Sequence, residues 1–263
     1  MSASPVIIVC YGWHDGLSAM LESLKAYSPK TPVHVIGNQV TRQHIECASV
    51  EAFGEYATKF ACVYEHHSPN GEQFELQCFM RWFVALEFMV SRQIESAWLL
   101  DWDVLVLCNL NDYDQENTVP IGACCHMDIT CLAHWCHFLF ITYHSKPNLN
   151  EFVEKMKAGD LKWPVISDMS LAEWWGREEK LIDPFAPDET NEVFDPNIST
   201  DDHGFVVELG TKRIRFENGY ALAYNAKSHS WVRMLTLHFQ GDRKRLMAGT
   251  LKKAMESKHA AFA

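Results

Sequence analysis

The residues of this chain best suited to chemistry are two aspartates, Asp101 and Asp103, inside an apolar run. Four apolar residues precede the pair and four follow it, over 97–107. In a buried strand, residues i and i+2 share a face, so this pattern predicts two carboxylates side by side. They would repel each other unless a cation that prefers oxygen ligands held both. The pattern therefore predicts a Mn²⁺ or Mg²⁺ site, with a solvated pair at a strand end as the alternative.

A second group of candidate residues lies near the other end of the chain, where a short apolar stretch ends in His238. An imidazole can complete a metal shell that carboxylates begin. Gly241 would let the backbone approach a phosphate closely, and Lys244 would supply a positive charge for it. The alternative for His238 is a buried side chain that only packs.

Together these two groups resemble the motifs of the GT-A glycosyltransferases. The sequence DWD at 101–103 follows an apolar strand, and HFQGDRK at 238–244 lies near the C-terminus. Within that fold the chain is most similar to the glycogenin-like retaining branch, whose late motif reads His-x-x-Gly-x-x-Lys-Pro-Trp. Arg245 and Leu246 stand where that motif has Pro-Trp. The order of the elements matches over nearly the whole chain.

The resemblance implies a metal ion and a nucleotide diphosphate sugar at these motifs. Asp101 would contact the ribose and the metal, while Asp103 and His238 would ligate the metal. Lys244 and the backbone of Gly241 would hold the β-phosphate, which becomes part of the leaving group.

The resemblance also places the nucleoside of the donor near the end of the first strand. Tyr11 and Gly12 follow that strand directly, and Trp102 lies between the two acidic residues. These three residues complete the expected set for binding the donor. Packing at a strand end is the alternative for Tyr11.

Two further residues join Lys244 as candidates for catalysis. Arg81 interrupts an apolar helix, and in similar enzymes a basic residue there reaches the donor sugar or phosphate; an Arg that extends from the helix edge is the alternative. Asp168 lies in a strand-to-helix turn, where the family often has an Asp near the reacting carbon. It could instead favour a helix N-terminus, because 170–173 read as a capping box. Lys59 is a weaker candidate of the same kind as Arg81.

Alternating strands and helices would position these residues. Strands at 6–10 and 33–37 flank a helix at 17–27, which predicts a parallel pair with a right-handed crossover. A helix at 74–92 leads into the acidic run. The later expected strands are 119–123, 137–142, 212–216 and 221–224, and the later expected helices are 148–158, 169–175 and one from 245.

This alternation predicts an α/β, GT-A-like single domain over 1–263, with a mixed, mostly parallel central sheet flanked by helices. Residues 1–110 would form the half that binds the nucleotide sugar, and 111–263 the half that binds the acceptor. The segment 183–202 holds seven acidic residues, three prolines and no Lys or Arg. We interpret it as a mobile lid over the site.

A cluster of cysteines and histidines at 124–137 has the composition of a zinc site but not the spacing of paired Cys-x-x-Cys knuckles. Buried, inert cysteines are the favoured interpretation. Within the cluster, 134–137 precede the expected strand and could line the acceptor pocket.

Composition limits the classes of function. The net charge of −11 argues against general nucleic-acid binding, although a metal and a few cations would still allow nucleotide binding. Nine irregularly spaced cysteines favour a reducing, cytoplasmic setting, and we expect neither a signal peptide nor a membrane span. Basic residues at 243–258 either form a solvated helix face or mediate peripheral contact with an anionic membrane.

The function that the sequence predicts is a metal-dependent hexosyltransferase. It would transfer a hexose from a UDP-sugar, UDP-glucose or UDP-galactose above others, to a carbohydrate or another hydroxyl acceptor, with retention of configuration. Two alternatives stay open. A sugar-phosphate nucleotidyltransferase shares the α/β layout but carries a glycine-rich loop after its first strand, where this chain has only Gly12 and Gly16. A non-catalytic carbohydrate- or nucleotide-binding protein would not need all of the motif residues together.

Overall fold

A five-stranded sheet forms the centre of the computed structural model, which describes residues 4–12, 14–37, 46–113, 118, 123–158, 165–182 and 191–260. The strand order is β3-β2-β1-β4-β6. β1 is parallel to β2 and β4, β2 is parallel to β3, and β6 is antiparallel to β4. The bounds are Val6–Cys10 for β1, Val33–Gly37 for β2, Glu46–Ala48 for β3, Ser96–Leu100 for β4 and Cys124–Asp128 for β6.

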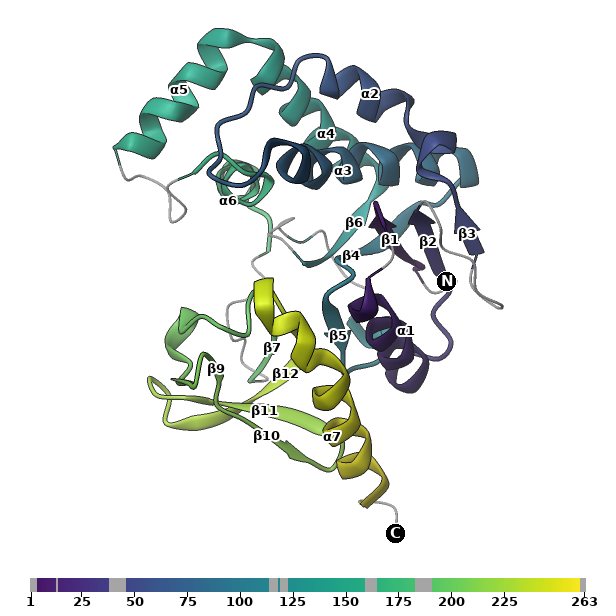
Figure 1. The fold of residues 1–263 in the computed structure, drawn as a ribbon, viewed down its shortest axis with the longest axis vertical. Coiled ribbons are helices and arrows are strands. Elements are labelled where there is room, and N and C mark those ends of the chain that lie inside the picture. Colours follow the sequence, from purple (N-terminus) through teal and green to yellow (C-terminus); the bar gives the residue numbers. More distant parts are fainter. Residues whose placement is uncertain are drawn as a thin grey trace.

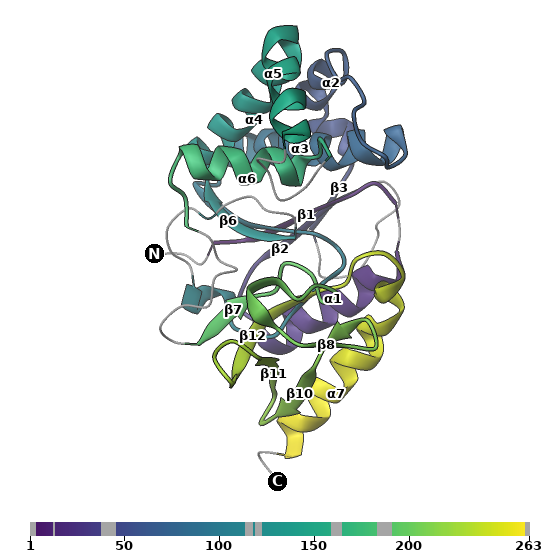
Figure 2. The same cartoon turned by 90° about the vertical axis from the view of Figure 1, so that its left-hand side faces the viewer.

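Helices lie on both sides of this sheet. Five of them, α2 to α6, cover the upper face in Figures 1 and 2, whereas α1 lies below the sheet with α7 beside it. The bounds are Asp15–Tyr27 for α1, Glu55–Ala61 for α2, Glu72–Arg92 for α3, Ile129–His144 for α4, Lys146–Lys157 for α5, Asp168–Glu178 for α6 and Met247–Ala260 for α7. The predicted α/β class with a mixed, mostly parallel sheet is therefore confirmed. None of the helices in the described ranges is long and apolar enough to cross a bilayer.

Strand β1 shows why both faces of the sheet need a cover. Val6 and Ile8 are buried in one apolar cluster together with Leu17 of α1, whereas Ile7 is buried in another together with Phe79 of α3. Successive side chains of a strand point to opposite faces, so an unbroken apolar strand must be buried on both.

A second sheet lies below the first and includes the end of the acidic run (Figures 1 and 2). Its order is β10-β11-β12-β5, with β7 parallel to β12. β12 and β5 are antiparallel, and His238 is in register with Val104. The bounds are Val104–Val106 for β5, Glu192–Phe194 for β7, Ile214–Glu217 for β10, Tyr220–Asn225 for β11 and Ser230–His238 for β12; β8 (Val207–Glu208) and β9 (Thr211–Lys212) form a hairpin. This register brings the end of β12 to the acidic residues.

Two predictions about strands are wrong. The run at 97–107 is not one strand, because the chain leaves β4 after Leu100, turns through 101–103 and enters β5 in the second sheet. The segment 137–142 belongs to helix α4, whose first turn is capped by the Asp128 carboxylate accepting from the Cys131 N–H at 2.7 Å. Helix α4 packs among other helices, so its apolar residues do not form the single stripe that marks a surface helix.

The expected lid is ordered structure over the part that the model describes. Residues 183–190 lie outside the described ranges. Beyond them, Val193 and Phe194 of β7 are buried against β12, and Asp195 is fully buried. The prediction of a mobile lid is therefore wrong for 191–202.

Helix α1 begins in close contact with the turn that carries the acidic pair. A Cβ built on Gly16 would lie 2.9 Å from the Trp102 indole and 2.9 Å from the Met247 sulfur. Only glycine allows α1, the turn and α7 to approach this closely.

We expect Gly16→Ala to lower the free energy of unfolding by about 1–3 kcal/mol, because the rigid indole must move to admit the methyl group. This loss would exceed the better helix propensity of alanine. Urea denaturation measures it, with Gly12→Ala as the control, since a Cβ there meets nothing within 4 Å. Equal stability of the two variants would contradict the close packing at Gly16.

Candidate functional site

The turn between β4 and β5 and the end of β12 bring three predicted metal ligands together. Asp101 and Asp103 lie in the turn, and His238 ends β12 opposite Val104. One ligand atom from each of the three side chains lies within 4.8 Å of the other two. The acidic pair converges because a turn folds it toward another strand, not because it shares a strand face.

The geometry of His238 fits a divalent cation. Its Nδ1 lies 2.6 Å from the carbonyl oxygen of Pro196, which can only accept, so Nδ1 carries the proton. Nε2 is then the ring atom that faces Asp103, 3.4 Å from its Oδ1, and it presents a lone pair whenever it carries no proton. Neighbouring ligands of an octahedral Mg²⁺ or Mn²⁺ lie about 3 Å apart. With Nε2 deprotonated, a cation between the two atoms would be ligated by both.

Lys244 forms an ion pair with the other carboxylate oxygen of Asp103. Its Nζ lies 3.1 Å from Oδ2, and the Asp103 side chain is 8 % exposed. Burial opposes ionisation of this carboxyl, but His238 and Lys244 more than offset it and hold its pKa below the ordinary value. The contribution of Asp103 to stability is therefore present at neutral pH and is lost as the pH falls through the lowered pKa.

Trp102, between the two aspartates, is held by aromatic and cationic contacts. The ring of His14 stacks on it at 4.0 Å with an interplanar angle of 9°, and Lys244 Nζ lies 4.1 Å from its ring centre. Burial and the nearby Lys244 lower the pKa of His14, so that its ring is neutral at pH 7. These contacts fix the middle of the turn between the two aspartates.

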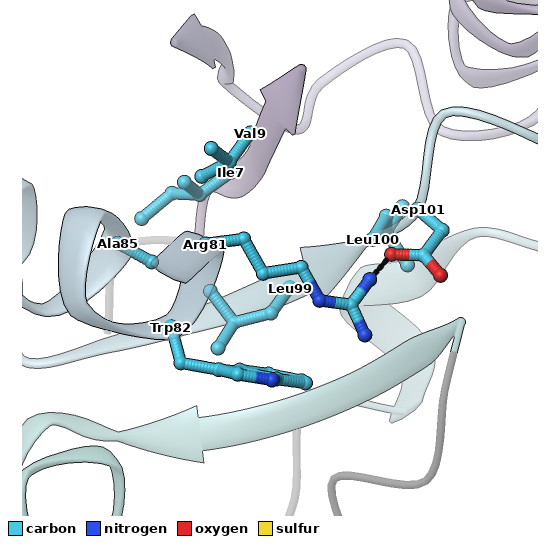
Figure 3. A pocket seen from close by; sticks show the side chains of 8 residues that line it. All are labelled: Ile7, Val9, Arg81, Trp82, Ala85, Leu99, Leu100 and Asp101. Carbon is cyan, nitrogen blue, oxygen red and sulfur yellow. Dashed lines mark ion pairs between the residues drawn. The ribbon is translucent and has the colours of Figure 1, made fainter. Parts of the chain in front are cut away.

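Arg81 reaches the site from helix α3. Figure 3 shows its side chain crossing from α3, above Leu99 of β4, to form an ion pair with Asp101. The same guanidinium pairs with Asp168 at 2.8 Å, and only 15 % of the Arg81 side chain is exposed. The alternative of an arginine that extends into solvent is therefore wrong.

Asp168 begins helix α6 and is buried beside Arg81. Its Oδ2 accepts from Arg81 and also from the indole N–H of Trp82 at 3.2 Å. The capping box at this helix is made by Ser167 and Ser170, not by 170–173. Asp168 therefore faces the guanidinium that also contacts Asp101, and another residue caps the helix.

Arg81, Asp101, Asp103 and Lys244 line one pocket of about 430 Å³, whereas His238 and Asp168 lie behind them and do not line it. Tyr11 lines it, and the buried Tyr11 hydroxyl has no hydrogen-bond partner among the described residues. Gly12 and Gly241 do not line it, although Gly241 has a left-handed φ of 56° and open space around it. The pocket is lined by Val9, Cys10, Tyr11, His14, Phe74, Gln77, Cys78, Arg81, Asp101, Trp102, Asp103 and Lys244.

Sequence reasoning missed an ion pair that supports His238. Asp195 and Lys212 are both fully buried, and Lys212 Nζ lies 2.7 Å from Asp195 Oδ1. The other Asp195 oxygen accepts the backbone N–H of His238 at 3.1 Å, and Lys212 also donates to the carbonyl of Asn197. The pair thereby anchors the segment that includes the Pro196 carbonyl. Nothing in the spacing of these residues indicates that they meet.

Other candidates lie elsewhere. Lys59 is exposed on α2 and pairs with Glu55. His134 and His137 are exposed on α4 and do not line this pocket, and the proximity of 134–137 to an acceptor stays a prediction. Within the described residues, only the group at Asp101 has three side chains placed to hold a metal, and the Cys/His cluster at 124–137 does not gather into such a site.

We expect Lys212→Met to lower the free energy of unfolding by about 3–5 kcal/mol, because it leaves Asp195 charged and buried without its partner. Adding Asp195→Asn in the same chain should recover part of the loss by removing that charge. Denaturant unfolding of the two single variants and the double variant measures the coupling. Additive losses would mean that the two side chains do not act as a pair.

Comparison with known proteins finds similar solved structures. No family model matches the chain, and neither does any curated protein. The chain is similar to the apo form of mouse xyloside xylosyltransferase 1, with 9% identity, a TM-score of 0.46, and coverage of 70% of this chain and 87% of that one. It is also similar to the apo form of the glycosyltransferase GlyE of Streptococcus pneumoniae TIGR4, with 11% identity, a TM-score of 0.34, and coverage of 67% and 43%. The functional proposal rests on the geometry of the site.

Proposed function

We propose that this chain is a metal-dependent glycosyltransferase that binds a nucleotide diphosphate sugar in the pocket at Asp101. One observation carries the proposal: the ligand atoms of Asp101, Asp103 and His238 converge within 4.8 Å. They do so beside a pocket into which Arg81 and Lys244 bring positive charge. Two carboxylates and two cations that line one cavity, with His238 beside Asp103, suit a substrate that carries two phosphates.

The two carboxylates and the imidazole would hold Mn²⁺ or Mg²⁺. The bound ion supplies a Lewis acid that stabilises the diphosphate as it leaves the sugar. The charge of Lys244 acts on the same phosphate, and it is held in place by Asp103 and the ring of Trp102. The open backbone at Gly241 is accessible to a phosphate oxygen. Catalysis would thus depend on charges positioned before the substrate arrives.

The sugar would lie toward Arg81 and Asp168. The guanidinium links Asp101, at the metal, to Asp168, so a donor bound at one carboxylate would have its sugar near the other. We propose a hexose donor, UDP-glucose or UDP-galactose, transferred with retention to a carbohydrate or another hydroxyl compound. Tyr11, at the end of β1, is proposed to contact the nucleoside with its unpartnered hydroxyl.

We expect Asp103→Ala to abolish Mn²⁺-dependent binding of UDP, because it removes an anionic ligand at the centre of the cluster. His238→Ala should weaken binding less, since water can replace a neutral ligand. Isothermal titration calorimetry with Mn²⁺ and with EDTA measures both, and the exposed Asp112→Ala is the control. Unchanged affinity for UDP in Asp103→Ala would refute the site.

We expect Lys244→Ala to reduce the release of UDP from UDP-glucose or UDP-galactose by about 10²-fold or more, because the charge acts on the leaving phosphate. Its melting temperature should also fall, because Asp103 loses its cation, so turnover is expressed per folded molecule. Lys252→Ala is a control on an exposed part of α7. A variant that melts much earlier yet turns over normally per folded molecule would make Lys244 structural.

A further inference from the structure

A second pocket lies away from the candidate site, between the β8–β9 hairpin, β10 and α7. Its volume is about 440 Å³, close to that of the first pocket. The two pockets border the same segment, because Lys244 lines the first while Phe239 and Arg245 line the second. Volumes of this size are typical of sites for small molecules.

The wall and the rim of this pocket are apolar. Ile198 and Phe239 are almost fully buried, and Phe216 continues the same surface. At the rim, Leu209 is fully exposed and has a left-handed φ of 53°, while Leu246 is 37 % exposed. An exposed leucine in a strained turn gains nothing from packing within this chain, so Leu209 points to a contact outside it.

Positive charge lies on the same rim. Arg245 and Lys253 are exposed, and neither forms an ion pair with a described residue. Arg213 also lines the pocket and pairs loosely with Glu208, at 3.7 Å between exposed side chains. The lining therefore carries an excess of positive charge on a chain with a net charge of −11. An anion is the complementary ligand.

Glycine 249 keeps one wall of the pocket open. Leu246, Gly249 and Lys253 follow one another at helical spacing and line the same side. A Cβ built on Gly249 would meet nothing within 4 Å, so packing within the chain does not require a glycine there. Glycine in a helix lowers stability, and its effect here is to leave space in the pocket.

We propose that this pocket binds an amphiphilic anion, namely a single aliphatic chain that ends in a phosphate group. The chain would lie on the half-buried Ile214 and Phe216 beside Gly249, and the phosphate would bind Arg245 and Lys253. The proposal does not depend on the glycosyltransferase activity, because it uses none of the residues of the first site.

The first experiment uses octyl phosphate below its micellar concentration, with calorimetry of the whole chain. We expect it to bind at least tenfold more tightly than inorganic phosphate or octyl glucoside, since each probe supplies only half of the chemistry. The double change Arg245→Gln and Lys253→Gln should lower the affinity by tenfold or more. Lys252→Gln, an exposed neighbour on α7 that does not line the pocket, should leave it unchanged.

The second experiment separates the site from the stability of the fold. Gly249→Leu should raise the melting temperature, because it improves the helix in open space, and should abolish binding of octyl phosphate. Gly249→Ala should also stabilise the helix but should retain binding, because it adds only one methyl group. Unchanged binding in Gly249→Leu, or inorganic phosphate binding as tightly as octyl phosphate, would overturn the proposal.

A third experiment tells where the ligand comes from. Liposomes that contain lysophosphatidic acid, which has one acyl chain and one phosphate, are sedimented with the chain and with the Arg245→Gln, Lys253→Gln variant. If the liposomes bind the unchanged chain but not the variant, the result would support the pocket and would indicate that its ligand is a membrane lipid. If the chain binds octyl phosphate but not the liposomes, the result would support the pocket and would indicate a free amphiphile as its ligand. If the liposomes bind both proteins equally, the proposed role of the two cations would be overturned.

Discussion

The buried aspartates around the candidate site are paired with cations from distant parts of the chain, and these pairs tie the structure together. Asp103 is matched by Lys244, and Asp195 is matched by Lys212. Arg81 serves Asp101 and, from the same guanidinium, Asp168 at the start of α6. Partners are drawn from distant parts of the chain, so charge neutralisation joins α3, α6, both sheets and the loop after β12. Three cations (Arg81, Lys212 and Lys244) thus face four carboxylates (Asp101, Asp103, Asp168 and Asp195), and a metal ion would supply positive charge that the network lacks.

The parts of the site that could be predicted from the sequence are those in which a residue type is unusual for its surroundings. Asp101, Asp103 and Arg81 each interrupt an apolar segment, and few roles suit a charged side chain in such surroundings. The paired strands at the start and the helix leading to the acidic run follow the expected periods, and the structure confirms them. Local sequence patterns were therefore enough to predict those elements in which the spacing of apolar residues determines which face is buried.

The failures have a common physical cause, which is tertiary context. Residues 137–142 are apolar on every side, so a strand and a buried helix give the same pattern, and only packing among other helices decides. The turn at 101–103 breaks an apolar run without glycine or proline, because β5 pairs with β12 of the second sheet. The pairing of Asp195 with Lys212 depends on where two segments meet, which no local spacing encodes.

The pairing of β12 with β5 has a consequence for how the protein is made. During synthesis the N-terminal elements leave the ribosome first, and the central sheet has all of its strands once β6 has been added. The acidic turn is then present, but His238, Lys244 and the Asp195 support are still to come. Until the last strand docks, Asp103 lacks both the ammonium group of Lys244 and the imidazole of His238. The nascent chain thus passes through a stage in which the acidic turn is present but His238, the third proposed metal ligand, is still missing.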